Sequence, residues 1–325
     1  MERALRAGES CALQWAGFHR KRLTLRVFVL GGTGLIGTAV VRELVGRGHE
    51  LFGLARSGAS VARLDHIGVT TFPGDIRSPD PWLARLPPCD AVIHMACDFA
   101  SDMGAIDRHL LDRLLPALAA QTERPRFIYT GGCWLFGATG DVAATEAAPF
   151  RPLPAFAWMV PQLHRVLASP GVDGIVIHPA MVYAGEGGVF DRFARAAAAG
   201  QPVPVVESEA VRWPLVHAAD LAQLYALALE RSGPGESYIG AAIEGFPVGR
   251  IASAFARHYL TGHEAPQIIA ADTVAAELGE WARGYALDQR LSGEKARREL
   301  GWEPRHLDPE GEILFGRPPN GADTK

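Results

Sequence analysis

The chain of 325 residues contains little cysteine, with only Cys11, Cys89, Cys97 and Cys133. Four cysteines without a C-x-x-C spacing exclude a disulfide framework and the usual zinc or redox motifs, so we expect no metal site and a cytoplasmic location. No apolar run approaches the roughly 20 residues of a membrane-spanning helix, and neither a basic tail nor an arginine stripe indicates nucleic acid. The net charge is −4. Together these features predict a soluble protein whose partner is a small-molecule substrate, not nucleic acid or a membrane.

The first 24 residues include basic side chains but lack the apolar core of roughly 7 to 15 residues that a secretory signal needs, so we interpret them as an extension outside the fold. From Leu25 to Tyr183, short apolar runs alternate with helical stretches, which predicts parallel strands joined by right-handed crossovers. The expected strands are residues 25–32, 49–56, 69–76, 90–96, 125–132 and 172–183, and the expected helices are 37–48, 61–68, 105–120 and 158–169. The pattern predicts an α/β fold with a Rossmann-type doubly wound parallel sheet.

After Tyr183 the alternation weakens. The pattern predicts a strongly apolar helix over residues 215–232 and a short strand over residues 236–241. Further helical stretches are expected at residues 248–260 and 292–302. The tail of residues 316–325 is polar and rich in proline and glycine, so we expect it to fray.

Three glycines mark the turn between the first strand and the first helix. Gly31, Gly34 and Gly37 suit a tight turn that a pyrophosphate can approach closely, followed by a helix packed near its strand. Because strand, glycines and helix stand in this order, the stretch predicts a dinucleotide site; the alternative is a glycine-rich turn without a ligand. The same turn would contribute Thr33, Leu35 and Ile36.

The second strand ends in a cation and a hydroxyl instead of an acidic residue. Arg56 and Ser57 suit a 2′-phosphate, which favours NADP(H) over NAD, although Arg56 could also be merely solvated. Asp75, followed by Ile76, comes just after the third strand, where it would meet the adenine edge. An aspartate there could equally cap the following turn.

The chain resembles the short-chain dehydrogenase/reductase superfamily in its extended form, the group of nucleotide-sugar epimerases and dehydratases. The matching pieces, in the family's order, are GGTGLIG, GDIRSPD, VIHMAC, FIYTGGCWLFG, VIHPAMVY, WPLVHAADLA and EKARRELGW. The resemblance implies an NADP-binding domain over residues 25–180, completed by about 214–242. Residues 181–213 and 243–325 would form a smaller C-terminal substrate-binding lobe. It also implies a homodimer through the helices of residues 105–120 and 158–169.

The resemblance also implies positions for individual residues. Met95, Ala96 and Cys97 would lie beside the cofactor, and Pro179 would lie near its nicotinamide. Tyr183 and His217 would face the substrate.

The chain lacks the three residues that carry catalysis in this superfamily. The serine falls on Gly132, the tyrosine near Ala155 and the lysine near Met159, and no lysine lies between Lys21 and Lys295. Asp107 replaces the asparagine that supports the proton transfer, and a carboxylate can exchange protons. Such a pattern is found in the branch of the superfamily that is called atypical. It predicts NADP(H) binding more firmly than it predicts any particular reaction.

Other groups near the expected pocket would then have to move the proton. The catalytic candidates are Asp107, Tyr183 and Cys133, although Cys133 could be a buried hydrophobe and Tyr183 a packed ring. The substrate pocket would be aromatic, with an arginine to hold an acidic group. Its expected residues are Asp98, Trp134, Trp158, Phe190, Arg192, Trp213 and His217, several of which could simply be core.

Three functions remain open. The first is an NADP(H)-dependent oxidoreductase or epimerase-like enzyme for a small organic substrate, such as a sugar-like compound or a secondary metabolite. The second is a lyase, cyclase or isomerase in which the dinucleotide is structural. The third is a non-catalytic protein that senses NADP(H), since serine, tyrosine and lysine are lost together.

Overall fold

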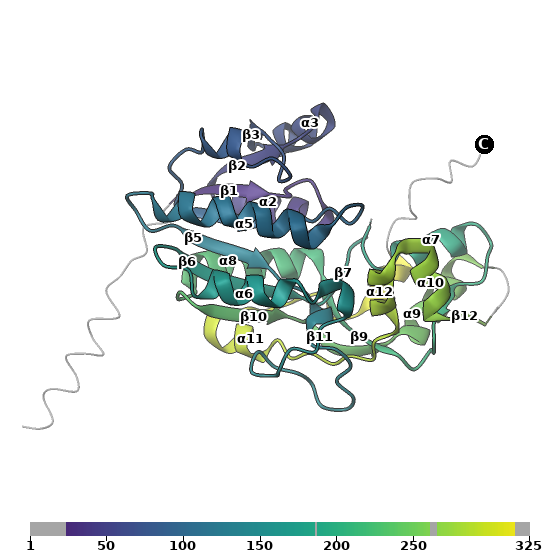
Figure 1. Ribbon diagram of the computed structural model, residues 1–325. Helices are drawn as coiled ribbons and strands as arrows, with labels where there is room; N and C mark the ends of the chain where they lie inside the picture. Colours follow the sequence, from purple (N-terminus) through teal and green to yellow (C-terminus); the bar gives the residue numbers. More distant parts are fainter. Residues whose placement is uncertain (1–23, 186, 261–264, 316–325) are drawn as a thin grey trace, which may run out of the picture.

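A seven-stranded parallel sheet forms the centre of the molecule (Figure 1). The computed structural model describes residues 24–185, 187–260 and 265–315. The strand order is β10-β6-β5-β4-β1-β2-β3. Its strands are β1 (Arg26–Leu30), β2 (Glu50–Ala55), β3 (Thr70–Pro73), β4 (Ala91–His94), β5 (Arg126–Thr130), β6 (Asp173–Pro179) and β10 (Glu236–Gly240). The chain adds strands β2 and β3 on one side of β1, and strands β4, β5, β6 and β10 on the other side. This arrangement confirms the Rossmann-type fold predicted from the sequence.

Helices cover both faces of this sheet. Helix α2 packs against α8, and α5 packs against α6; Figure 1 shows α5 and α6 in front of the sheet and α8 behind it. The helices along this part of the chain are α2 (Leu35–Gly46), α3 (Gly58–His66), α4 (Asp80–Leu83), α5 (Met103–Ala119), α6 (Met159–Leu167) and α8 (Ala218–Arg231). Two 3₁₀ turns, η1 (Cys133–Leu135) and η2 (Pro154–Phe156), lie between β5 and α6.

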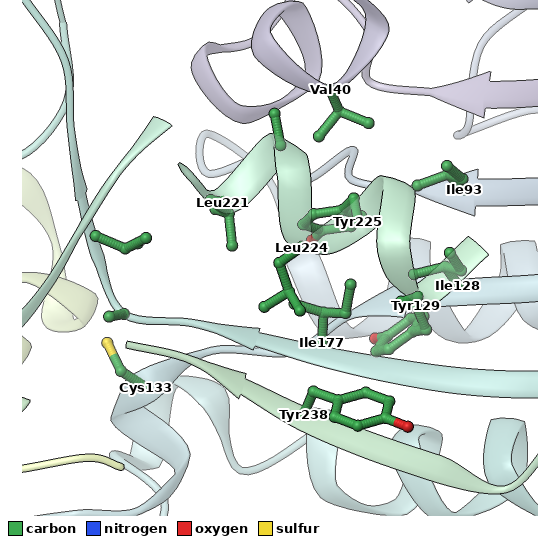
Figure 2. Close-up of a cluster of buried hydrophobic side chains, with 14 of the residues drawn as sticks. Val40, Ile93, Ile128, Tyr129, Cys133, Ile177, Leu221, Leu224, Tyr225 and Tyr238 are labelled. Atoms are coloured by element: carbon green, nitrogen blue, oxygen red, sulfur yellow. The ribbon is translucent and has the colours of Figure 1, made fainter. Parts of the chain in front are cut away.

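One part of the core lies between α8 and the sheet. Leu221 and Leu224 of α8 extend toward the strands, where Ile128 and Ile177 meet them (Figure 2). All four side chains are fully buried, and burying each contributes about 1.5–3 kcal/mol. Tyr225 is equally buried, and its hydroxyl lies 2.7 Å from the Thr130 hydroxyl, so this polar atom is satisfied inside the core.

A smaller lobe stands beside the carboxyl end of the sheet. Its three-stranded sheet has the order β11-β9-β7, with β7 parallel and β11 antiparallel to β9, and a second pair joins β8 and β12. The strands are β7 (Met181–Tyr183), β8 (Pro204–Val206), β9 (Arg212–His217), β11 (Ile243–Pro247) and β12 (Gln267–Ile269). The helices are α7 (Asp191–Ala198), α9 (Val248–Tyr259), α10 (Ala271–Leu278), η3 (Glu280–Ala286) and α12 (Pro309–Phe315).

Two expectations about the second half of the chain differ from the structure. The helix expected over residues 215–232 begins at Ala218, because the preceding residues pair with β7 and β11 as the end of strand β9. Helix α11 (Glu294–Leu300), expected in the smaller lobe, instead packs on β10 and α8. The Lys295 ammonium lies 2.6 Å from the Glu236 carboxylate of β10, which ties α11 to the edge of the main sheet.

The extension of residues 1–23 and the tail of residues 316–325 lie outside the described residues. Within the described ranges, no helix combines the length and apolar character that a membrane crossing requires.

Candidate active site

The glycine-rich turn opens onto a cleft at the start of α2. Gly31 has a φ of 86°, and a Cβ there would lie 2.6 Å from the Ala96 amide nitrogen. At Gly37 a Cβ would lie 2.0 Å from the Gly31 carbonyl oxygen. Both positions therefore require glycine. Gly31, Thr33 and Gly34 line a cleft of about 290 Å³ beside the first turn of α2, where backbone N–H groups favour a phosphate.

The far end of this cleft carries Arg56, Asp75 and Ile76. The exposed Arg56 guanidinium makes no ion pair with a carboxylate of the described residues, although it acts electrostatically on the Asp75 carboxylate in the same cleft. Ser57 caps α3 by accepting a hydrogen bond from the Ser60 amide, and Ser60, not Ser57, lines the cleft.

Asp75 has a partner of its own in the following turn. Its carboxylate lies 2.6 Å from the Arg77 guanidinium and accepts the Arg77 amide at 2.9 Å. These hydrogen bonds lower the pKa of Asp75. The turn-capping alternative is thus observed, although the residue also lines the cleft.

A second cavity, of about 320 Å³, adjoins the cleft at the carboxyl end of β4. Met95, Ala96 and Cys97 line both spaces. The second cavity is bounded mainly by apolar groups, and no arginine or lysine of the described ranges lines it. Its wall includes Ile36, Phe99, Trp134, Phe156, Trp158, Met159, Pro179, Met181 and Val182.

Three polar side chains meet at the wall of this cavity. The Asp107 carboxylate of α5 lies 3.0 Å from His94 Nε2 and accepts the Tyr129 hydroxyl at 2.9 Å. Strand register brings the partners together, because His94 of β4 is paired with Tyr129 of β5. All three are almost fully buried, with exposed fractions of 3%, 7% and 1% for His94, Asp107 and Tyr129. We call this set the His94–Asp107–Tyr129 network.

Tyr129 of the network and the nearby Cys133 both stay protonated at neutral pH. Burial, reinforced by the Asp107 carboxylate, raises the pKa of Tyr129 well above its usual value, so the phenol remains a hydrogen-bond donor. Burial also raises the pKa of Cys133 to about 12. Cys133 lines the cavity as a neutral thiol, with its sulfur 3.7 Å from Met181 Sδ.

Gly132, where the resemblance places the serine, and its neighbour Gly131 differ in how much room they leave for a side chain. A Cβ at Gly131 would lie 2.5 Å from Nδ1 of the buried His178 ring, whereas a Cβ at Gly132 would meet nothing within 4 Å. Gly132 and Met159 line the cavity. The His178 ring of β6 thus fills the space that a side chain at Gly131 would need, whereas a side chain at Gly132 would have room.

Several predicted pocket residues do gather at the second cavity. Trp134 and Trp158 line it, and the Trp134 ring lies against Phe156 and Trp281 at centroid distances of 5.5 and 6.1 Å. Asp98 lines the dinucleotide cleft instead of the substrate cavity.

Three other residues predicted for the site lie away from this cavity. Tyr183 lines neither cavity, and its hydroxyl donates to the His306 carbonyl at 2.9 Å. Phe190 stacks on Tyr183 at 4.8 Å, and Arg192 pairs with Glu277 at 3.4 Å. None of the three extends to the network.

Trp213 and His217 are also displaced from the cavity wall. The Trp213 indole donates to the Tyr285 carbonyl at 3.0 Å and reaches Trp134 only through the Tyr285 ring. His217 caps α8 and lines a separate groove beside Leu35. In the described part of the chain, no group of three His, Cys, Asp or Glu side chains could hold a metal ion.

Sequence reasoning missed Tyr129 and the partnership of His94 with Asp107. The available signal was weak: His94 and Tyr129 each stand near the carboxyl end of a predicted strand, but their approach to each other depends on the register between β4 and β5. Phe99, Phe156 and Met181 were missed as well, because each lies in a turn or at a strand end where the side-chain direction is set by the tertiary fold.

Comparisons with known proteins agree with this geometry. The model of the "NAD dependent epimerase/dehydratase family" matches residues 27–240. An uncharacterized protein of Schizosaccharomyces pombe is 30% identical over 290 residues, covering 87% of this chain and 96% of that protein.

Two solved structures illustrate the shared fold. A dTDP-glucose 4,6-dehydratase from Streptomyces venezuelae with NAD bound has a TM-score of 0.75 at 19% identity, over 90% of this chain and 95% of that one. The human epimerase family protein SDR39U1 with NADPH has a TM-score of 0.73 at 20% identity, over 90% of this chain and 98% of that one.

Proposed function

The chain belongs to the NAD-dependent epimerase/dehydratase family, and on that premise we propose that it is an NADP(H)-dependent oxidoreductase. Its substrate would be a small, uncharged, ring-containing carbonyl compound or the corresponding alcohol. The observation that carries the proposal is the continuity of the two cavities, which share Met95, Ala96 and Cys97. A dinucleotide whose phosphates lie on the glycine-rich turn would extend past these residues, so its nicotinamide would enter the second cavity.

That position supports hydride transfer over a purely structural cofactor. The cavity that would receive the nicotinamide has a volume of about 320 Å³, which the nicotinamide and a substrate would share. A protein that only senses the dinucleotide needs no such space for a second molecule. The cofactor, when bound, would supply the hydride, and the chain supplies orientation and an apolar enclosure.

The preference for NADP(H) rests on Arg56. Its exposed guanidinium lines the adenosine end of the cleft and makes no ion pair there with a described carboxylate, although Asp75 acts on it at longer range. A guanidinium in this position suits a 2′-phosphate. An acidic residue at this strand end would instead have favoured the free 2′-hydroxyl of NAD.

The substrate class follows from the lining of the second cavity. Nucleotide sugars carry two phosphates, and a site for them needs cationic side chains. No described arginine or lysine lines this cavity, whereas Trp134, Phe156 and Trp158 offer flat apolar surfaces. A neutral, ring-bearing molecule fits this lining better than a nucleotide sugar does.

Equilibrium titration of NADPH and NADH into the wild type and Arg56→Ala tests the cofactor assignment. A charge-assisted hydrogen bond contributes about 1.5–3 kcal/mol, so the variant should bind NADPH about 10- to 100-fold more weakly. NADH binding should hardly change, because NADH has no 2′-phosphate. Arg85→Ala, at an exposed arginine outside the cleft, is the matched control. Equal losses for both cofactors, or tighter NADH binding by the wild type, would refute the preference.

A homodimer and a cytoplasmic location remain predictions from the sequence. Sedimentation of the purified protein would test the first, and fractionation of cells would test the second.

A further inference from the structure

The His94–Asp107–Tyr129 network supplies the carboxyl group in the described lining of the substrate cavity, and a carboxyl group can exchange a proton. We propose that the Asp107 carboxyl group exchanges the proton with the substrate oxygen during hydride transfer, with His94 and Tyr129 as positioning residues. This inference rests on the proposed function, because it needs a hydride from NADPH. It assigns a catalytic residue in place of the missing serine, tyrosine and lysine.

Hydrogen bonds fix the position of the Asp107 carboxyl group. Tyr129 donates to Oδ2, and His94 Nε2 lies 3.0 Å from Oδ1. His94 Nδ1 is buried and has no partner among the described residues, so the contact of this ring with the network is made through Nε2.

The other titratable groups facing Asp107 are less suited to this role. Tyr129 is kept protonated by burial. Cys97 lies in the loop after β4 and is exposed to solvent. Met159 of α6 also lines the cavity, and its side chain has no titratable group. Within the described lining, Asp107 supplies the carboxyl group, and hydrogen bonds to His94 and Tyr129 hold its two oxygens.

Asp107 would give up a proton when the substrate is reduced and take one when it is oxidised. In reduction, the hydride of NADPH forms a C–H bond at the carbonyl carbon, the C=O π bond breaks, and the oxygen takes the proton of protonated Asp107. NADP⁺ and the alcohol leave, and bulk solvent returns a proton to the carboxylate. In oxidation, the Asp107 carboxylate accepts the hydroxyl proton while the hydride passes to NADP⁺. His94 and Tyr129 stabilise the charged carboxylate, as donors to an anion do.

The test uses the full chain with NADPH and a panel of uncharged aromatic ketones and quinones, with phenanthrenequinone as the first probe. Asp107→Asn should lower kcat about 10²-fold or more while NADPH binds as tightly as before, because general acid–base catalysis contributes in this range. Asp112→Asn is the matched control on α5: that carboxylate is exposed and pairs with Arg165, so the rate should equal that of the wild type.

A second variant tests the positioning role through a pH profile. Tyr129→Phe removes one donor to the carboxylate, which disfavours its charged form. The apparent pKa in the profile of kcat/KM should therefore move to higher pH, whereas a merely structural role would lower the rate without moving the profile. This readout remains available if Asp107→Asn does not fold.

The outcomes separate the two proposals. If the wild type reduces a probe, and Asp107→Asn matches Asp112→Asn or the Tyr129→Phe profile does not move, the role of Asp107 is wrong and the proposed function stands. If the wild type binds NADPH and reduces no probe, the proposed function fails and the proton transfer fails with it.

Discussion

Gly131 and Gly132 are adjacent in the chain, yet alanine should act on them with opposite signs. A Cβ at Gly131 would lie 2.5 Å from His178 Nδ1 and 2.8 Å from Cε1, closer than side-chain carbons approach such atoms. The His178 ring cannot retreat, because it is buried and lies against Phe136 and Phe150 at centroid distances of 5.2 and 5.7 Å. Overpacking of this kind costs about 1–3 kcal/mol.

At Gly132 the added methyl group has room. The backbone is extended, with φ −170° and ψ 159°, and nothing lies within 4 Å of the Cβ position. Alanine there should raise the free energy of unfolding by about 0.4–1 kcal/mol, because it restricts the unfolded chain. Urea denaturation of the wild type and both variants, followed by far-ultraviolet circular dichroism, measures the difference. Equal stabilities of Gly131→Ala and Gly132→Ala would refute the packing argument.

Two further predictions concern the glycine-rich turn and pH. Gly37→Ala places a Cβ 2.0 Å from the Gly31 carbonyl oxygen, so NADPH titration should show at least about tenfold weaker binding, while Gly46→Ala, with nothing within 4 Å, should bind normally. Burial lowers the pKa of His178 from 6.5 to about 4, so the unfolded chain binds more protons between these values, and stability should fall as pH drops through this window, by up to about 3 kcal/mol. Urea titrations across this range should show a smaller decline in His178→Leu, and an equal decline would contradict the assignment.

The cofactor half of the molecule was largely predictable because its signals are local. Gly31 and Gly37 are required by contacts within one turn and its neighbouring strand, and the turn follows a buried strand directly in sequence. Arg56 follows β2, so its place at the carboxyl edge of the sheet comes from the strand pattern alone.

The substrate half was harder because it depends on side-chain direction and strand register. Asp107 was predicted near the pocket, but its partners His94 and Tyr129 depend on how β4 pairs with β5. Tyr183 stands on β7, where its ring turns toward Phe190 and His217 and away from the cavity. A two-residue periodicity gives opposite faces to neighbouring residues, and the sequence does not say which face meets the cavity.

An isotope label can follow the hydride that we propose passes from NADPH to a carbonyl carbon in the cavity beside Asp107. The most direct measurement uses NADPH deuterated at the transferred position of C4 with a reducible aromatic ketone, followed by mass spectrometry of the alcohol. With the wild type, deuterium should appear on the carbinol carbon of the product, and labelling should be much slower with Asp107→Asn. Product without deuterium would contradict hydride transfer and would favour an isomerase or lyase with a structural dinucleotide.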